Sequence, residues 1–237
     1  MSVAMADQPG RASFTFTGSG FGLLGWSIVV ALAQIVILPL AWASAAYYRW
    51  FFGKLQVSDG ARASFDGNAE EVWGWFALVG VLWWVQQAPR LADDPGAAMG
   101  ITLLVTLLVL PISAGVWLSI LRWVIANANV GSGSHLRFTG TYAGYLGWSL
   151  LLLVSLVTII GWAWATVGML QWLCRNIEGG ERRFQFEISG WDVLWRTIAL
   201  AVTAMFLIPI PWMLAWFVRW YVSCVRMETV PAAAPSA

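Results

Sequence analysis

The sequence has few charged residues, and long stretches of it have none. Only 11% of the residues are charged, whereas 59% are hydrophobic, and the mean hydropathy is +0.71. Soluble domains of average composition contain about 25% charged residues, so this composition indicates a membrane protein. The net charge of +1 provides no basic surface of the kind that binds nucleic acid, and we expect no nucleic-acid partner.

Residues typical of catalytic and metal sites are also scarce. The chain has one histidine, His135, and two cysteines, Cys174 and Cys224, whose spacing is not that of a metal site or a disulfide. His135 lies in a linker rich in glycine and serine, where a histidine is usually solvated. The apolar stretches lack Asp and Glu, the residues that usually carry protons in coupled transport. We therefore expect a protein that is not an enzyme and has no cofactor or metal.

The sequence does contain a pattern that occurs four times. Each copy opens with a short aromatic segment, and a tryptophan follows about eight residues later. The openings are Phe16-Thr17-Gly18, Phe65-Asp66-Gly67, Phe138-Thr139-Gly140 and Phe186-Glu187, and the tryptophans are Trp26, Trp75, Trp148 and Trp195. Each copy closes with a basic or amide residue and a tryptophan, namely Arg49-Trp50, Arg122-Trp123, Gln171-Trp172 and Arg219-Trp220. Recurrence at such a period is typical of one supersecondary unit used repeatedly.

These copies define the expected domain organisation. We expect one integral membrane domain over residues 12–228, composed of units 12–57, 58–130, 131–178 and 179–228, between disordered tails at 1–11 and 229–237. Charges are absent from four gaps, between Arg11 and Arg49, Asp94 and Arg122, Arg137 and Arg175, and Arg196 and Arg219. A hydrocarbon core about 30 Å thick needs about 20 apolar residues as a helix, so each gap predicts at least one crossing.

The distribution of charge predicts the topology. The linkers between units are basic, whereas the loop at 89–96 is acidic. By the positive-inside rule, the linkers and both termini are then cytoplasmic. Each unit must enter and leave on one side, which predicts helical hairpins with turns at Pro39, at the acidic loop, at Gly161 and at Pro209. The predicted fold is an α-helical polytopic membrane protein with eight membrane segments, or six as the alternative, and short cytoplasmic β-strands.

The hairpin arms raise a question of depth. In the first unit, each arm between Pro39 and its flanking tryptophan measures roughly 16–20 Å at 1.5 Å per residue, which is short of a full crossing. Either the arms extend beyond their tryptophans, or the hairpins are shallow and turn inside the bilayer. The aromatic openings at 14–17, 63–66, 136–139 and 184–187 alternate apolar and polar residues, as half-buried strands do, and we expect these strands to pair with one another.

Several of these motifs resemble those of a known family. The Phe-x-Phe-x-Gly opening, the apolar run that ends in Ile37-Leu38-Pro39-Leu40-Ala41-Trp42, the linker from Asn127 to Phe138 and the second Phe-Thr-Gly motif are similar to those of the YjgN-like bacterial inner-membrane proteins. The resemblance covers residues 12–228 and implies a location in the bacterial inner membrane. It implies no activity, because the function of that family is unknown. Gly161 and Gln171 depart from the Pro and Arg of the other units.

Two sets of residues are candidates for lipid contacts. Arg49, Arg122 and Arg219 occupy one equivalent position in three units, where they either anchor the topology or bind anionic lipid headgroups or a small anion. Trp50, Trp123, Trp172 and Trp220 follow them directly or hold the matching position, and we expect these tryptophans to act as interfacial anchors.

The scarcity of chemistry favours a membrane-organising or envelope-associated protein whose partners are membrane lipids, including anionic ones. A small-solute transporter or channel is the main alternative, since pseudo-repeats are common in such proteins. A lipid-processing enzyme is the third hypothesis.

Overall fold

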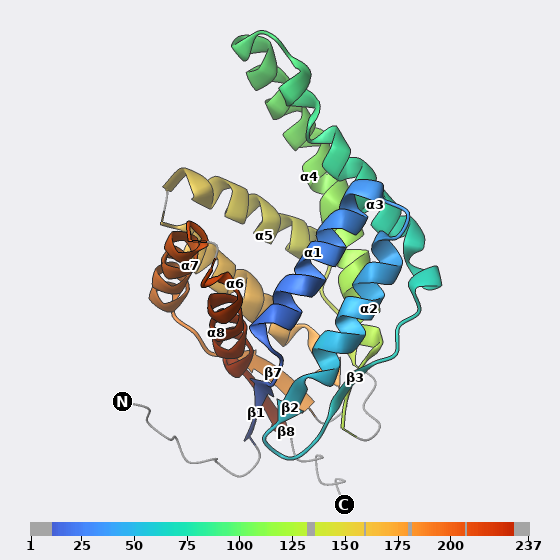
Figure 1. The fold of residues 1–237 in the computed structure, drawn as a ribbon, viewed down its shortest axis with the longest axis vertical. Coiled ribbons are helices and arrows are strands. Elements are labelled where there is room, and N and C mark those ends of the chain that lie inside the picture. The colour runs from blue at the N-terminus through green and yellow to red at the C-terminus, as the bar shows by residue number, and fades with distance from the viewer. Residues whose placement is uncertain (1–10, 132–135, 159, 180–181, 207, 230–237) are drawn as a thin grey trace, which may run out of the picture.

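The computed structural model describes residues 11–131, 136–158, 160–179, 182–206 and 208–229. Its helices stand on one side of a curled sheet (Figure 1). The first and last described strands both belong to this sheet, which lies at the end of the molecule opposite the tip of the longest hairpin. Arg11 and Thr229 belong to these strands, whereas the rest of the two predicted tails lies outside the described residues.

The described chain follows the order strand, helix, helix, strand four times, with short 3-10 helices (η) added in places. The first segment contains β1 (Arg11–Phe16), α1 (Gly20–Val36), α2 (Leu40–Gly53) and β2 (Leu55–Val57). The second contains β3 (Ala63–Phe65), η1 (Ala69–Glu71), α3 (Trp73–Val85), η2 (Ala88–Leu91), α4 (Pro95–Ala126) and β4 (Ala128–Val130). The third contains β5 (Arg137–Phe138), α5 (Tyr142–Ser155), η3 (Leu156–Thr158), α6 (Trp162–Arg175) and β6 (Ile177–Gly179). The fourth contains β7 (Arg182–Phe186), α7 (Gly190–Ala204), α8 (Ile210–Ser223) and β8 (Val225–Thr229).

The strands form an antiparallel sheet in the order β2-β1-β8-β7-β6-β5, and β3 pairs with β4 separately. A bridge between Gln56 and Arg62 links β2 to the start of the β3 segment. In every unit the first strand is followed, beyond the hairpin, by a strand that pairs with it. The sequence interpretation missed these second strands (β2, β4, β6 and β8), although Val225-Arg226-Met227-Glu228 alternates as a strand should.

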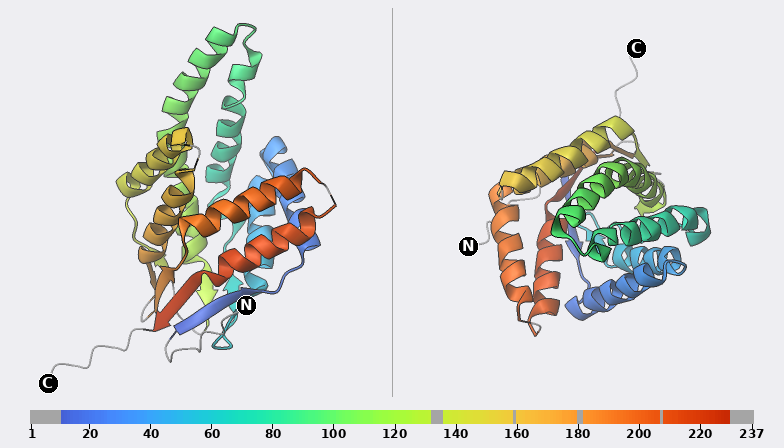
Figure 2. Two further views of the ribbon diagram at one scale, coloured as in Figure 1. Left: turned by 90° about the vertical axis from the view of Figure 1, so that its left-hand side faces the viewer. Right: turned by 90° about the horizontal axis from the view of Figure 1, so that it is seen from above.

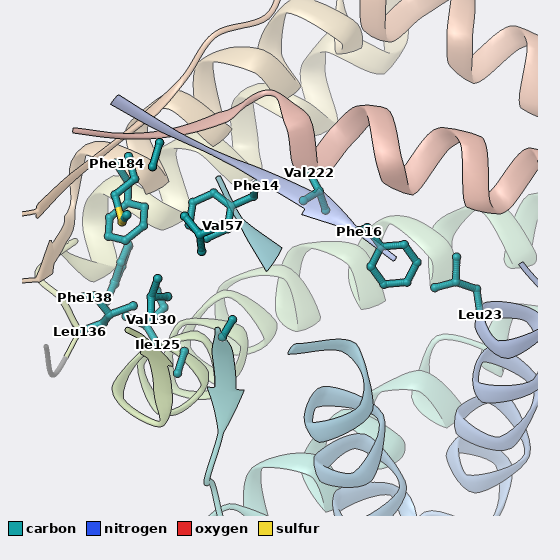
Figure 3. Packing of buried hydrophobic residues seen from close by; sticks show 14 of the residues in the cluster. Phe14, Phe16, Leu23, Val57, Ile125, Val130, Leu136, Phe138, Phe184 and Val222 are labelled. Carbon is teal, nitrogen blue, oxygen red and sulfur yellow. The ribbon is translucent and has the colours of Figure 1, made fainter. Parts of the chain in front are cut away.

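The apolar side of the sheet forms the core beneath the helices. Phe14 and Phe184 stack with their ring centroids 6.3 Å apart, and Val57, Phe138 and other apolar side chains gather around them (Figure 3). The alternate residues of the same strands, such as Thr15, point outward and are exposed. The period of two along a strand therefore gives this sheet one buried and one polar face.

Each first helix begins at a side-chain cap placed directly after the third position of the aromatic motif. Ser19, Asn68, Thr141 and Ser189 accept a hydrogen bond from a backbone N–H two or three residues ahead, which satisfies one of the donors left free at a helix start. The second motif position joins the two ends of the unit. The N–H groups of Thr17, Asp66, Thr139 and Glu187 donate to the carbonyls of Lys54, Asn127, Asn176 and Cys224, which end the second helices.

The helix lengths overturn the prediction of six to eight membrane segments. Seven of the described α-helices have 13 to 17 residues, about 20–26 Å at 1.5 Å per residue, which is less than the hydrocarbon core. Among the described residues, α4 with 32 residues is the one helix long and apolar enough to cross a membrane. The turns at 37–39 and near Pro209 agree with the predicted hairpins. The count of membrane segments was wrong because it treated each hairpin arm as a crossing, although the arms are too short for one.

The α3–α4 hairpin projects beyond the other three, away from the sheet (Figures 1 and 2). Its extra length comes from α4, which continues through Pro111. The loop at its tip, between η2 and α4, contains Asp93 and Asp94. The side chain of Asp94 accepts a hydrogen bond of 2.7 Å from the N–H of Ala97 and so caps α4.

The four hairpins form a closed ring above the sheet. The second helix of each unit packs on the start of the next unit: α2 on β3 and η1, α4 on β5 and α5, α6 on β7 and α7, and α8 on β1 and α1. The last contact joins the fourth unit to the first, so the ring closes (Figure 2). We call each of these contacts between successive units a seam.

Candidate functional site

At three seams an arginine of the second helix donates to the motif glycine of the next unit. The Nη2 atoms of Arg49 and Arg122 lie 2.9 Å and 3.0 Å from the carbonyl oxygens of Gly67 and Gly140. Arg219 reaches Gly18 across the closing seam at 3.3 Å. The three predicted lipid-contact arginines therefore link successive units, and each is an exposed residue.

The glycine at the third motif position is required by close packing. A Cβ atom added to Gly140 would lie 2.4 Å from Cζ of Phe138 and 2.8 Å from the ring of Trp172. At Gly67 it would meet the rings of Phe65 and Trp123 in the same way. The motif glycine thus lets a phenylalanine and a tryptophan meet while its own carbonyl accepts the arginine.

The predicted anchor tryptophans lie against this packing. Trp50, Trp123 and Trp172 meet the last motif phenylalanine of their own unit edge to face, with centroids 6.0, 5.1 and 5.8 Å apart. Trp123 is buried and donates from Nε1 to the carboxylate of Glu71 at 3.0 Å. The other three are partly buried. All four therefore contribute to packing inside the protein, and their role as interfacial anchors stays a prediction.

The fourth unit has an arginine where the other units have a tryptophan in the first helix. The helix cap Ser189 shows that Arg196, and not the adjacent Trp195, occupies the place of Trp26 and Trp148, because each lies seven residues after its cap. The sequence interpretation, which took Trp195 as the equivalent, was one residue out of register. The Arg196 guanidinium lies 4.4 Å from the ring of Trp195 and 4.2 Å from that of Trp220.

Arg196 also pairs with an acid on its own helix. Its Nη1 atom lies 2.8 Å from the Asp192 carboxylate, a spacing of four residues that places both on one face of α7. Its buried Nε atom has no hydrogen-bond partner among the described residues. Cation–π contacts with Trp195, Trp220 and, at 5.8 Å, Trp216 hold the guanidinium in place, and we assign Arg196 to the packing of α7 on α8.

The seam between the third and fourth units lacks the arginine link. Gln171 stands where the other units have Arg, and Ile188 stands where they have the motif glycine. Both partners of the link are thus replaced together. Within the described part of the chain, the Gln171 side chain makes no hydrogen bond. The departure at Gln171 was visible in the sequence, but its pairing with Ile188 was not.

A cavity of about 810 Å³ lies at this seam. The end of α6, β6 and β7 line it with Gln171, Cys174, Arg175, Glu178, Arg183, Gln185 and Glu187, together with apolar side chains. Burial raises the pKa of the Cys174 thiol to about 11, so this cysteine stays protonated at neutral pH. The sequence interpretation gave Cys174 no role in a metal site or disulfide, and it named none of the charged residues of this cavity as a site.

A second, smaller cavity of about 280 Å³ lies between α1, α3 and α4. Gln34, Gln86 and Ser113 contribute its polar atoms, and Trp83 and Trp117 form part of its wall. The Gln34 side chain donates to the carbonyl of Val79 at 3.5 Å. The two cavities share no lining residue. His135 lies outside the described residues, and no cluster of His, Cys, Asp or Glu in the described part of the chain is suited to a metal ion.

Residues 11–234 match the sequence model of a family described as a bacterial protein of unknown function (DUF898). The match covers nearly the whole chain and confirms the resemblance to the YjgN-like proteins. No curated protein and no solved structure is significantly similar to this chain.

Proposed function

The chain belongs to the DUF898 family of bacterial proteins of unknown function, and we propose that it is an inner-membrane protein that organises the lipids around it. In this proposal the sheet lies at the cytoplasmic surface. The α1–α2, α5–α6 and α7–α8 hairpins enter one leaflet and turn within the bilayer. In the long hairpin, α4 crosses the bilayer. The other arm consists of α3 continued by η2 and packs along α4, so that the acidic tip is exposed on the other side.

The observation that carries the proposal is that hairpin length and tip chemistry change together. The tips of the three short hairpins expose Leu38, Val157 and Ile208, with relative accessibilities of 71%, 83% and 83%. The long hairpin instead carries Arg90 and Asp93 at its tip. Hydrocarbon solvates apolar side chains and excludes charge. A bilayer would therefore accept the short tips and leave the long one in water.

The backbone at the short tips is suited to this environment, because lipid offers no partner for a free N–H or C=O group. In the first hairpin, the N–H groups of Ile37 and Leu40 donate to the carbonyls of Ala33 and Ile37. In the third, the Thr158 hydroxyl donates to the Ser155 carbonyl at 2.7 Å and accepts from the N–H of Gly161 at 3.0 Å. In the described part of both turns, these groups thus find partners within the protein rather than in water.

Apolar and polar side chains are also separated on the rest of the surface, between the helices and the sheet. Large apolar side chains are exposed along the helices, for example Leu104 and Leu107 on α4, Ile28 on α1 and Val154 on α5. The outward side chains of the strands are polar or charged. An exposed apolar surface that continues over several helices marks a membrane or partner contact.

This arrangement would organise lipid in two ways. Three hairpins that occupy one leaflet add lateral area to that leaflet, whereas the other leaflet accommodates the α3–α4 hairpin alone. Arg49, Arg122 and Arg219 are exposed cations at the level where helices meet strands, and cations at that depth attract anionic headgroups. A solute transporter would instead need a continuous polar path, and the two separate cavities do not favour one.

Depth-dependent quenching tests the placement. Single cysteines at Leu38, Val157 and Met205 in a background without Cys174 and Cys224 carry an environment-sensitive fluorophore in reconstituted vesicles. We expect quenchers on lipid acyl chains to reduce their emission, and a water-soluble quencher to have little effect. A cysteine at Ala92 should show the reverse and react with an impermeant reagent from one side. Water-accessible labels at all four positions would contradict the proposal.

The organising role needs its own measurement. Vesicles with increasing amounts of reconstituted protein should become smaller or more tubular by electron cryomicroscopy, while an entrapped small solute is retained. Vesicles of unchanged shape that release the solute would instead support a channel.

A further inference from the structure

The cavity between the third and fourth units lies at the seam that lacks the arginine link of the other three. At the closing seam, β1 pairs with β8 as far as Ser13, and Arg219 then reaches Gly18. At the third seam, β7 pairs with β6 only at Gly179–Arg182 and Glu178–Arg183. Gln171, which stands in place of the arginine, lines the cavity together with Phe184 and Phe186.

Among the described side chains that line the cavity, two are cations and two are carboxylates. Arg175 and Arg183 are the cations, and Glu178 and Glu187 are the carboxylates. Glu187 lies 3.9 Å from Arg226. Arg175, Arg183 and Glu178 have no ion-pair partner within the described ranges. Arg137 on β5 lies opposite Glu178 in register but does not line the cavity.

This lining disfavours ligands of a single charge. An anion attracted by the two arginines would approach Glu178, and a cation attracted by Glu178 would approach the arginines. A zwitterion places a negative group on the guanidiniums and a positive group on the carboxylate. Guanidinium groups bind phosphate oxygens especially well because their donors match the geometry of phosphate. An ammonium group can donate to Glu178 and to the amide oxygen of Gln171.

The size and position of the cavity fit a headgroup. Pockets that bind small molecules enclose about 300–1,000 Å³, and this one encloses about 810 Å³. Gln171 stands at the level of Arg49, Arg122 and Arg219. We propose that the third seam binds a phosphate ester that carries a primary ammonium group, of the phosphoethanolamine type. That a membrane lipid supplies this group rests on the proposed function, whereas recognition of the free headgroup does not.

Titration of detergent-solubilised full-length protein with three soluble headgroups tests the recognition. We expect glycerophosphoethanolamine to bind, and glycerophosphoglycerol and glycerophosphocholine to bind at least tenfold more weakly. Glycerophosphoglycerol has no ammonium group, and the quaternary ammonium of glycerophosphocholine has no N–H to donate. Equal or tighter binding of glycerophosphoglycerol would overturn the proposal. The absence of binding of all three compounds in isothermal titration calorimetry would overturn it as well. Nanodiscs with and without phosphatidylethanolamine then tell whether the lipid occupies the site, since lipid in the cavity should compete with the soluble headgroup.

Two sets of variants locate the site. The double change Gln171→Arg and Ile188→Gly restores the pair found at the other seams, so it should fill the cavity and abolish binding without lowering the melting temperature. Arg175→Gln and Arg183→Gln should each weaken binding about tenfold or more, the loss expected for a hydrogen bond to a charged group. Lys54→Gln, the same loss of charge at the end of α2, is the matched control. Unchanged binding in both arginine variants would contradict the proposal even if the double variant failed to fold.

Discussion

Arg219 donates from Nη2 to the carbonyl oxygen of Gly18, 3.3 Å away in space and 201 residues away in sequence. The same contact joins Arg49 to Gly67 and Arg122 to Gly140, in each case over 18 residues. A single interaction thus connects both neighbouring units and the two ends of the described chain. Its loss at Gln171 leaves a cavity at one seam.

Replacing one of these arginines should loosen its seam. We expect Arg122→Gln to lower the stability of the protein by about 1 kcal/mol, because a charge-assisted hydrogen bond to Gly140 is lost at an exposed position. The melting temperature in detergent measures this effect. Lys54→Gln removes an equal charge without such a bond and should leave the melting temperature unchanged. Equal melting temperatures of all three proteins would show that the link contributes no stability.

The motif glycine should tolerate no side chain. Gly140→Ala places a methyl group 2.4 Å from Cζ of Phe138, and we expect a loss of about 1–3 kcal/mol from overpacking. Gly147 lies in α5 with no atom within 4 Å of an added Cβ, so Gly147→Ala should stabilise the protein by up to about 1 kcal/mol. Chemical denaturation in detergent compares the two. The prediction fails if both substitutions shift stability in the same direction.

A charge at a short hairpin tip should impede membrane integration. Val157→Lys would place an ammonium group among the exposed apolar side chains of the α5–α6 tip, at a cost of about 2.5–3.5 kcal/mol in the bilayer centre. Ala92→Lys at the acidic tip of the long hairpin is the control and should be neutral. The fraction of protein that resists alkaline extraction from membranes reports the difference. Identical extraction of both variants would place the short tips in water.

The Cys174 thiol should react slowly and in a pH-dependent way. Burial raises its pKa to about 11, so at pH 8 about one molecule in a thousand carries the thiolate. In a Cys224→Ser background, its alkylation rate should rise about tenfold per pH unit between pH 8 and 10. A cysteine introduced at Ala92 should approach its plateau near pH 9. Matching profiles for the two thiols would show that Cys174 is not buried.

The same shift affects stability. The folded state holds the proton more tightly than the unfolded chain, whose thiol has the ordinary pKa of 9.0. The resulting stabilisation is fully present below pH 9 and is lost as the pH rises toward 11. Cys174→Ala should remove this part of the alkaline decline in melting temperature.

The sequence predicted those parts of the fold that depend on residues close together in the chain, such as the breaks between helices. Pro39 and Pro209 interrupt apolar runs, and helices break there because proline cannot continue the hydrogen-bond ladder. Gly60 and Gly131 follow β2 and β4, and both adopt positive φ, a conformation that glycine reaches without steric cost. The three-residue strands β2 and β6 were missed because such short segments carry little pattern of their own and are defined by their partners.

Membrane depth and the site at the third seam depend on contacts between units. In the gap of 37 residues without charge between Arg11 and Arg49, the sequence indicated a turn at Pro39 but not how far each arm extends. The helix ends show this: α1 has 17 residues and α2 has 14. Likewise, Gln171 looked like a single departure from a pattern. Its meaning follows from Ile188, the residue that replaces its glycine acceptor in the next unit, and from Arg183 on the neighbouring strand.

The pairing of β1 with β8, in which Arg11 lies opposite Glu228, closes the ring of units. The fold therefore does not depend on which unit the sequence begins with. A circularly permuted chain, opened at the Gly60 turn and joined by a short linker between the present ends, would retain every described seam. Such a permutant should fold to the same ring, since only the connection between β2 and β3 would be lost.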